Sequence, residues 1–569
     1  MGETILKLED VAVSFRSGKT EKELVQGVSF SIEQGQTFAL VGESGSGKSI
    51  TSLAIIGLLP SMAQVSQGKI FLGQQDLSRL DERRLQQIRG QQIAMIFQEP
   101  MTSLNPLSRV GRQIMEPMLV HCLHDKKESR EKALYLLDKV GIPNPHESFN
   151  KYPHELSGGQ QQRVMIAMAL SCNPRLLIAD EPTTALDVTV QRQVLELIRS
   201  LQDEFSMSLL FITHDLGVVA EVADHVGVMY QGKLEEVNGM TELFQRPRSA
   251  YTKGLIACRP PLDFKPRRLA TLDDFLQQRK IEVLSEQVPH SDSSIILELK
   301  DISKSFAGSG ILPWQKKKAF KAVDSVSLKV ARGLTLGIVG ESGCGKTTLA
   351  RTMIRLLTPD AGQILLEGQD IGFKPQRDLV DIRRKMQYIF QNPYGALNPK
   401  MTVEDIMLEP MKIHNYGGSL AERLDKVKHL IERVGLDATM LQRFPHEFSG
   451  GQRQRICIAR VLSLDPELII CDESVSALDV SVQAQILNLL QDLQEEKGLT
   501  YIFISHDLSV VKYFSDQVAV MYQGRIIENA RADEIYNHPQ QAFTQELLSA
   551  IPKDFPVGTD DVLNEIYIR

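Results

Sequence analysis

The stretch VGESGSGKSI, Val41 to Ile50, decides the fold, and it returns almost unchanged as VGESGCGKTT, Val339 to Thr348. Both copies satisfy the pattern GxxxxGK followed by Ser or Thr, after an apolar run typical of a buried strand. Glycines let the backbone wrap tightly, so that N–H groups and a helix start converge on anionic oxygens. Strand, glycine loop and helix in this order predict an α/β fold with a ligand at the strand ends.

Length and composition indicate an ordinary soluble protein with two large domains or several small ones. At 569 residues the chain is too long for one hydrophobic core, and its formal charge of −7 lacks the basic field that nucleic acids require. No secretory pattern opens the chain, and no apolar run reaches the roughly 18–20 residues that span a bilayer. The six cysteines form no CxxC pair, so neither zinc modules nor disulfides are expected.

A long internal repeat organises the chain. Residues 155–191, ELSGGQQQRVMIAMALSCNPRLLIADEPTTALDVTVQ, recur as residues 447–483, EFSGGQRQRICIARVLSLDPELIICDESVSALDVSVQ. The repeat predicts a first domain at 1–262, a linker at 263–294 with a short helix around LDDFLQQRK, and a second domain at 295–569. Because joined domains have a high effective concentration for each other, we expect an intramolecular pseudo-dimer.

Two nucleotide sites are predicted from the glycine loops. The lysine of each loop adds a positive charge at the outer phosphates, and the hydroxyl after it coordinates Mg²⁺. The residues expected to hold phosphate are Gly42, Gly45, Gly47, Lys48 and Ser49 in the first loop and Gly340, Gly343, Gly345, Lys346 and Thr347 in the second.

An acidic pair ends each of two later apolar runs, LLIADE and LIICDE. Asp180 and Asp472 are expected to face the metal, and the strand alternation predicts that Glu181 and Glu473 point the other way. There each glutamate is placed to polarise an attacking water as a catalytic base. A strand end capped by solvated acids would be the simpler interpretation if the glycine loops were absent.

The motifs LSGGQ (residues 156–160) and FSGGQ (residues 448–452) resemble the signature sequence of the ATP-binding cassette family. Physically, a serine before two glycines at a helix start is an anion-binding cap. With the loops and acidic pairs, the resemblance covers essentially the whole chain. It implies α/β architecture with two tandem P-loop ATPase domains, each with a mixed sheet flanked by helices plus a helical subdomain.

In this family the signature of one domain closes on the γ-phosphate that the other domain holds. The resemblance therefore implies two composite ATP sites, one joining Lys48 to Ser449 and the other joining Lys346 to Ser157. The signature residues implied to contact ATP are Ser157, Gly158, Gly159, Gln160, Ser449, Gly450, Gly451 and Gln452.

Further residues match family motifs in both halves. Gln98 and Gln391 resemble the loop glutamine that senses Mg²⁺ and links the site to a transport partner. His214 and His506 resemble the switch histidine that contacts the γ-phosphate and assists catalysis. Two histidines at matching positions favour this role over that of ordinary surface or core residues.

Two more pairs are carried over from the family. Asp187 and Asp479 resemble the loop that crosses between halves. Phe15 and Phe306 occupy the place of an aromatic residue that stacks on adenine, with core packing as the rival interpretation.

Both halves keep the glutamate, histidine and serine, so two hydrolytic sites are expected. The second half departs by Phe448 in its signature, by Ser474 where the first half has Pro182, and by Cys344 where it has Ser46. That position in the loop accepts any small residue, but a thiol near a helix start is expected to have a lowered pKa.

Loop sequences QEPMTSLNP and QNPYGALNP resemble the oligopeptide, dipeptide and nickel importer branch of the family. So do the extensions RPRSAYTKGLIACRPPL and HPQQAFTQELLSAIP and the insertion ILPWQKKKAFKAVDSVSL. The resemblance implies the ATP-hydrolysing subunit of a bacterial importer, bound peripherally to the cytoplasmic face of the inner membrane. Its implied partners are two permeases and, through them, a solute-binding protein, with peptides, glutathione, a peptide antibiotic or nickel as cargo.

Tandem cassettes that act on ribosomes as translation factors are the alternative. They join their halves by a long, strongly charged helical hairpin, whereas this linker is short and mixed in charge. Helix-like stretches lie at 110–123 and 129–140, and again at 403–414 and 420–434. They predict a helical subdomain in each half, whose apolar residues either pack within it or, in an importer, receive helices of the membrane subunits.

Overall fold

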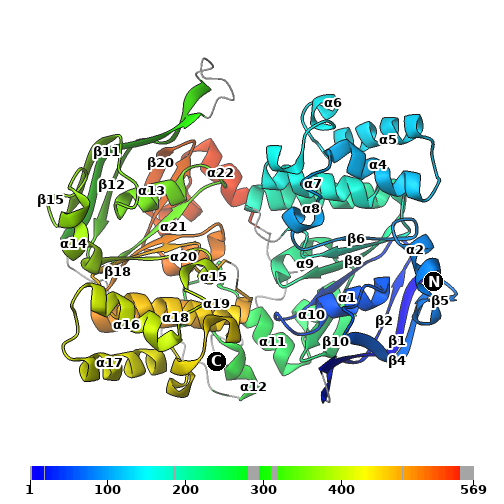
Figure 1. Cartoon of the computed structure of the whole chain (residues 1–569), viewed down its shortest axis with the longest axis horizontal. Helices are drawn as coiled ribbons and strands as arrows, with labels where there is room; N and C mark the ends of the chain where they lie inside the picture. Colours follow the sequence, from blue (N-terminus) through cyan, green and yellow to red (C-terminus); the bar gives the residue numbers. More distant parts are fainter. Residues whose placement is uncertain are drawn as a thin grey trace.

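The structure is a computed structural model of the chain and describes residues 3–17, 20–183, 187–262, 264–277, 279, 294–308, 317–476 and 478–551. Its two halves have the same order of strands and nearly the same order of helices, and they lie side by side (Figure 1). Residues 309–316, in the predicted insertion, and 280–293, in the predicted linker, lie outside the described residues.

Strands of the first half form two sheets. Their bounds are β1 Thr4–Ser17, β2 Thr20–Glu33, β3 Thr37–Val41, β4 Ala63–Leu72, β5 Gln75–Asp76, β6 Ile93–Ile96, β7 Leu176–Asp180, β8 Ser208–Thr213, β9 His225–Tyr230 and β10 Lys233–Gly239. One sheet has the order β10-β9-β3-β8-β7-β6, parallel except for β10, and the other is antiparallel with the order β2-β1-β4-β5. The mixed sheet confirms the predicted fold class.

The second half repeats both sheets. Its strands are β11 Ile295–Gly308, β12 Lys317–Ala331, β13 Thr335–Val339, β14 Ala361–Leu366, β15 Gln369–Asp370, β16 Met386–Ile389, β17 Leu468–Asp472, β18 Thr500–Ile504, β19 Gln517–Tyr522 and β20 Arg525–Arg531. The mixed sheet has the order β16-β17-β18-β13-β19-β20, and the antiparallel sheet has the order β12-β11-β14-β15. Strands β3, β7, β13 and β17 are buried along their whole length, as expected of parallel strands covered on both faces.

Helices connect and cover these sheets. In the first half they are α1 Lys48–Ile56, α2 Glu82–Ile88, α3 Pro100–Ser103, α4 Val110–Val120, α5 Lys126–Lys139, α6 Pro145–Ser148, α7 Gly158–Ala169, α8 Val188–Phe205, α9 Leu216–Val222, α10 Met240–Gln245, α11 Ala250–Ala257 and α12 Leu272–Leu276. In the second half they are α13 Lys346–Met353, α14 Val380–Lys385, α15 Pro393–Ala396, α16 Val403–Ile413, α17 Leu420–Arg433, α18 Gly450–Leu462, α19 Val480–Lys497, α20 Leu508–Phe514, α21 Ala532–Asn537 and α22 Ala542–Ser549. Helices α4, α5, α16 and α17 confirm the predicted helical stretches.

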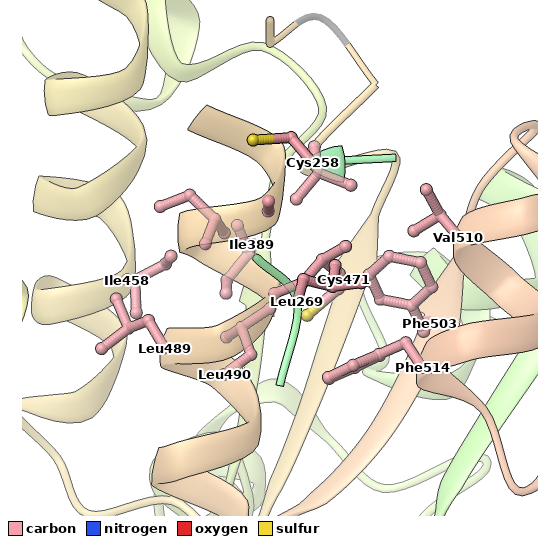
Figure 2. Packing of buried hydrophobic residues seen from close by; sticks show 14 of the residues in the cluster. Cys258, Leu269, Ile389, Ile458, Cys471, Leu489, Leu490, Phe503, Val510 and Phe514 are labelled. Atoms are coloured by element: carbon pink, nitrogen blue, oxygen red, sulfur yellow. The ribbon is translucent and has the colours of Figure 1, made fainter. Parts of the chain in front are cut away.

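Part of the stretch predicted to link the halves packs into the second half. We call residues 264–277 the strap; it includes the expected short helix, α12. Leu269 and Ala270 of the strap are buried at 1% and 0% exposure, within one apolar cluster that also contains Cys471 and Phe503. Figure 2 shows Leu269 among these side chains of the second half. The two halves therefore share a hydrophobic core at the strap.

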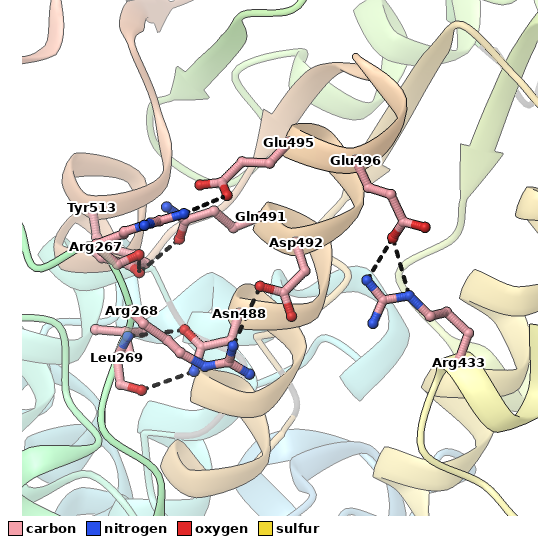
Figure 3. A network of polar contacts seen from close by, with 10 residues as sticks. All are labelled: Arg267, Arg268, Leu269, Arg433, Asn488, Gln491, Asp492, Glu495, Glu496 and Tyr513. Carbon is pink, nitrogen blue, oxygen red and sulfur yellow. Dashed lines mark hydrogen bonds and ion pairs between the residues drawn. The ribbon is translucent and has the colours of Figure 1, made fainter. Parts of the chain in front are cut away.

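Polar contacts fix the register of the strap (Figure 3). The side-chain amide of the buried Asn488, on α19, accepts from Leu269 N at 2.9 Å and donates to Leu269 O at 2.8 Å. Arg268 pairs with Asp492 at 3.4 Å and Arg267 with Glu495 at 3.1 Å, both on the exposed side. Asn488 thus satisfies both backbone groups of a residue that water does not reach.

We expect Asn488→Ala to loosen the strap and lower stability by about 2 kcal/mol or more, because it leaves two buried backbone groups without partners. The thermal unfolding midpoint of the whole chain measures this loss. Arg268→Ala is the matched control, since it removes an exposed ion pair worth about 0–1 kcal/mol. Equal midpoints for the two variants would contradict the role of Asn488.

Candidate nucleotide sites

The first glycine loop joins β3 to α1 and can be built only with glycine at its tight points. Gly42, Gly45 and Gly47 have φ angles of 146°, 79° and 106°. A Cβ at Gly42 would lie 2.1 Å from Met229 O, so no larger residue fits. Lys48 begins α1, and its ammonium group folds back over the loop to donate to Gly42 O at 2.7 Å. Burial lowers the pKa of Lys48, although nearby carboxylates oppose the shift.

The second loop, between β13 and α13, repeats this geometry. Gly340, Gly343 and Gly345 have φ angles of 148°, 79° and 113°. A Cβ at Gly345 would lie 2.0 Å from Ala322 O. Lys346 donates to Gly340 O at 2.7 Å. Both loops therefore have the lysine at the centre of a backbone cradle suited to phosphate.

A hydroxyl and a carboxylate meet beside each loop. Ser49 Oγ lies 3.2 Å from Asp180 Oδ1, and Thr347 Oγ1 lies 3.1 Å from Asp472 Oδ1. Burial raises the pKa of Asp180 to about 6, and it raises that of Asp472 as well. Hard oxygen donors beside a phosphate cradle are the set that Mg²⁺ prefers, so these residues fit that ion.

The glutamate after each aspartate is placed by a turn rather than by the strand. Strands β7 and β17 end at Asp180 and Asp472, and Glu181 and Glu473 adopt left-handed φ angles of 48° and 47°. The backbone N–H of each glutamate still donates to the neighbouring strand, at 2.9 Å in both halves. Strand alternation, from which we expected their direction, therefore does not set it.

In the first half, Glu181 gathers the other predicted residues around it. Its Oε2 accepts from Gln98 Nε2 at 2.7 Å, and its Oε1 lies 3.2 Å from His214 Nδ1. Burial would lower the pKa of His214, but the hydrogen bond and charge of Glu181 outweigh it, so that pKa is raised.

The second half has the same cluster, but the contact between its histidine and glutamate is longer. Glu473 accepts from Gln391 Nε2 at 2.6 Å, and His506 Nδ1 lies 3.7 Å from its Oε2. Burial would raise the pKa of Glu473, but the contact with His506 and the charge of Lys346 leave it lowered. These contacts therefore favour the charged form of Glu473.

The signature serines cap α7 and α18 as the pattern predicts. Ser157 Oγ accepts from Gln160 N at 3.4 Å, and Ser157 N donates back to the Gln160 side chain at 3.1 Å. Ser449 and Gln452 form the same reciprocal pair at 3.3 and 3.0 Å. Because each serine oxygen is the acceptor here, its own proton is available to an anion above the helix start.

Glycines behind these caps differ in their surroundings. A Cβ at Gly158 or Gly450 would meet nothing within 4 Å, whereas a Cβ at Gly159 or Gly451 would approach a valine of the following long helix at 3.3 or 2.5 Å. Packing within the chain accounts for the second glycine of each pair. The first glycine leaves open space beside an exposed helix start.

Reciprocal contacts cross between the halves at the glycine loops. Asp479, at the start of α19, accepts from both the backbone N–H and the hydroxyl of Ser44 at 2.9 Å. Asp187, at the start of α8, accepts from Ser342 N at 3.3 Å. Ser44 and Ser342 lie in the first and second glycine loops, so each loop touches the half that does not contain it.

Phe15 and Phe306 lie on β1 and β11, in the antiparallel sheets. Phe15 is half-buried, and Phe306 is 42% exposed. This exposure speaks against core packing as the role of Phe306.

The pKa of the Cys344 thiol is shifted in the direction opposite to the one we expected. Burial raises the pKa of its thiol, although the charge of Lys346 opposes the shift. The partly buried side chain of Cys344 also packs against the apolar core of the second half. The expectation of a lowered pKa was wrong because loss of hydration outweighs the helix start.

Alkylation should therefore be slow at Cys344. At pH 7 we expect a maleimide to label the exposed Cys122 well before Cys344, whose rate should rise about tenfold per pH unit until its pKa is reached. Peptide mass spectrometry after timed quenching measures both rates. Labelling of Cys344 as fast as Cys122 at pH 7 would contradict the burial argument.

Sequence reasoning missed two tyrosines that touch the sites. Tyr388 donates to Asp472 Oδ2 at 2.5 Å, and Tyr251, in the extension of the first half, accepts from Glu43 N in the glycine loop at 3.1 Å. The sequence did hold a signal for Tyr388. It lies three residues before Gln391, and the corresponding residue of the first half, three residues before Gln98, is a methionine. No pattern linked Tyr251 to the loop, because their contact joins distant parts of one half.

Models of known protein families match both halves of the chain. The ABC transporter family model matches residues 25–184 and 323–476, and a model of the C-terminal region of oligopeptide/dipeptide transporters matches residues 236–280. Helices both long and apolar enough for a bilayer are absent from the part of the chain that the structure describes.

Similar proteins extend along nearly the whole chain. The glutathione import ATP-binding protein GsiA of Escherichia coli (strain K12) is 44% identical over 588 residues, which cover 99% of this chain and 93% of that protein. The protein of the same name from Pectobacterium atrosepticum is 44% identical over 560 residues, with coverages of 96% and 89%. Among solved structures, the dimeric ATP-binding cassette MJ0796 bound to ADP and Pi aligns with 41% of this chain and 98% of its own at 28% identity and a TM-score of 0.38. The chain belongs to the ABC transporter family, in which it is an ATPase with two tandem ATP-binding domains.

Proposed function

We propose that the chain hydrolyses ATP at two sites between its halves and thereby drives the import of glutathione or a related small peptide. The assignment of the cargo rests on the 44% identity to glutathione import proteins over 99% of the chain. That likeness also favours an importer over the translation-factor alternative. In this proposal, two permeases hold the chain at the cytoplasmic face of the inner membrane, and a solute-binding protein delivers the cargo to them.

Each site combines the glycine loop of one half with the signature of the other. The contacts of Asp479 with Ser44 and of Asp187 with Ser342 support this pairing, because they place each loop against the opposite half. In the first site Lys48 would hold the outer phosphates while Ser449 donates to the γ-phosphate. In the second site Lys346 and Ser157 would do the same.

Chemistry in each site follows from the glutamate cluster. Glu181 and Glu473 would accept a hydrogen bond from the attacking water and increase its nucleophilicity. The glutamine and histidine beside each glutamate hold the carboxylate in place, at 2.7 and 3.2 Å in the first half. Ser49 with Asp180, and Thr347 with Asp472, would hold Mg²⁺, which supplies positive charge to the phosphates when it is bound.

Closure on ATP and opening after hydrolysis give the permeases two states to follow. Proteoliposomes with the chain, its two permeases and its binding protein should take up radiolabelled glutathione only when ATP is supplied on the side of the chain. Uptake of other short peptides without glutathione would change the cargo but not the reaction. Co-sedimentation of the chain with ribosomes rather than membranes would refute the importer assignment.

A further inference from the structure

Tyr388 supports Asp472, the carboxylate of the second half that is expected to face the metal. Its hydroxyl donates to Asp472 Oδ2 at 2.5 Å, while Asp472 Oδ1 accepts from Thr347 at 3.1 Å. Tyr388 is 5% exposed and Asp472 is 1% exposed, so water does not compete for either contact. Both oxygens of this carboxylate therefore have fixed directions.

Strand pairing explains the contact. Tyr388 lies on β16, which runs parallel to β17, and the register places Tyr388 beside Ile470, two residues before Asp472. The phenol is long enough to reach the end of the neighbouring strand. Its ring is held in turn against Phe390, with the ring centroids 4.8 Å apart.

The first half is built differently at the same place. Strand β6 carries Met95 at the position that Tyr388 has on β16, one residue before the last residue of the strand in each case. A thioether cannot donate a hydrogen bond, so Met95 cannot hold Asp180 in this way. Asp180 nevertheless keeps the contact with Ser49 at 3.2 Å. The two halves thus share the metal-side pair and differ in what supports it.

We propose that Tyr388 is a positioning residue of the second ATP site, where it orients Asp472 so that this site binds Mg²⁺ more tightly than the first. The inference rests on the proposed role of Asp472 as a metal ligand. Partners that orient a metal ligand from outside typically contribute 10–100-fold to metal affinity. A hydrogen bond to a charged acceptor also belongs to the stronger class of such contacts.

Mn²⁺ can serve as the probe, because free Mn²⁺ is counted directly by its electron paramagnetic resonance signal. Glu181→Gln and Glu473→Gln in every chain prevent turnover, and Lys48→Ala empties the first site so that the second is read alone. With ATP present, we expect Tyr388→Phe to weaken Mn²⁺ binding about tenfold. Tyr388→Met, which copies the first half, should weaken it to a similar extent.

Two controls separate positioning from general damage. In chains with Lys346→Ala instead of Lys48→Ala, which report the first site, Tyr388→Phe should leave Mn²⁺ binding unchanged. Affinity for ATP in the presence of EDTA should also stay unchanged in the second site. These readouts do not depend on catalytic activity.

Three results would overturn the inference. Unchanged Mn²⁺ affinity of the second site in both variants would show that Tyr388 does not orient Asp472. A parallel loss of metal-free ATP affinity would show that the tyrosine only supports the fold. If the chain with Tyr388 intact binds no Mn²⁺ with ATP at either site, the proposed function itself fails, and the inference fails with it.

Discussion

Replacing both Glu181 and Glu473 by glutamine should lower ATP turnover by about 10²-fold or more and leave ATP binding nearly unchanged. A glutamine has almost the same shape as a glutamate, but it carries no negative charge to attract a proton from water. Side chains outside the glycine loops hold the two carboxylates: Gln98 with His214 in the first half and Gln391 with His506 in the second. Phosphate release from the purified chain measures turnover, and a fluorescent ATP analogue measures binding.

Each single substitution tests one site, and Glu204→Gln serves as a control for the change of charge. Glu204 is an exposed residue on α8 that pairs with Lys139 at 3.0 Å, so its replacement should leave turnover unchanged. Turnover of the double variant within a few-fold of the unmodified chain would remove Glu181 and Glu473 as bases. Loss of ATP binding together with turnover would instead indicate damage to the loops.

The motifs that bind through backbone geometry were predictable from the sequence. Gly42 and Gly340 are needed because a Cβ would strike a backbone carbonyl, at 2.1 and 2.2 Å, and such a requirement appears directly as glycine in the pattern. The capping role of Ser157 and Ser449 could likewise be predicted, because it requires only that each serine stand directly before a helix. Local chemistry of this kind depends on a few consecutive residues, which the sequence displays.

Features that depend on the tertiary environment were not predictable. The direction of Glu181 depends on a left-handed turn that no alternation rule anticipates, and the pKa of Cys344 depends on how deeply the thiol is buried. The strap has a charged sequence, KPRRLATLDD, in which Leu269, Ala270 and Leu272 nevertheless enter the core. Their burial follows from α19 presenting Asn488 to the strap backbone, a contact between residues more than two hundred positions apart.

Crossed substitutions should reveal which loop and which signature form one site. With Glu181→Gln and Glu473→Gln to prevent turnover, the chain should retain two ATP molecules after rapid gel filtration. Lys48→Ala combined with Ser449→Arg should leave one, because both changes fall in the same composite site. Lys48→Ala combined with Ser157→Arg should leave none, because the changes then fall in different sites.

Self-contained halves would give the opposite pattern. Lys48 and Ser157 both belong to the first half, so their double substitution would then spare one site, and the pair Lys48 and Ser449 would spare neither. The contact of Asp479 with Ser44 at 2.9 Å favours the composite arrangement, since the first loop is already held by the half that carries Ser449. Radiolabelled ATP retained per chain distinguishes the two patterns without any measurement of transport.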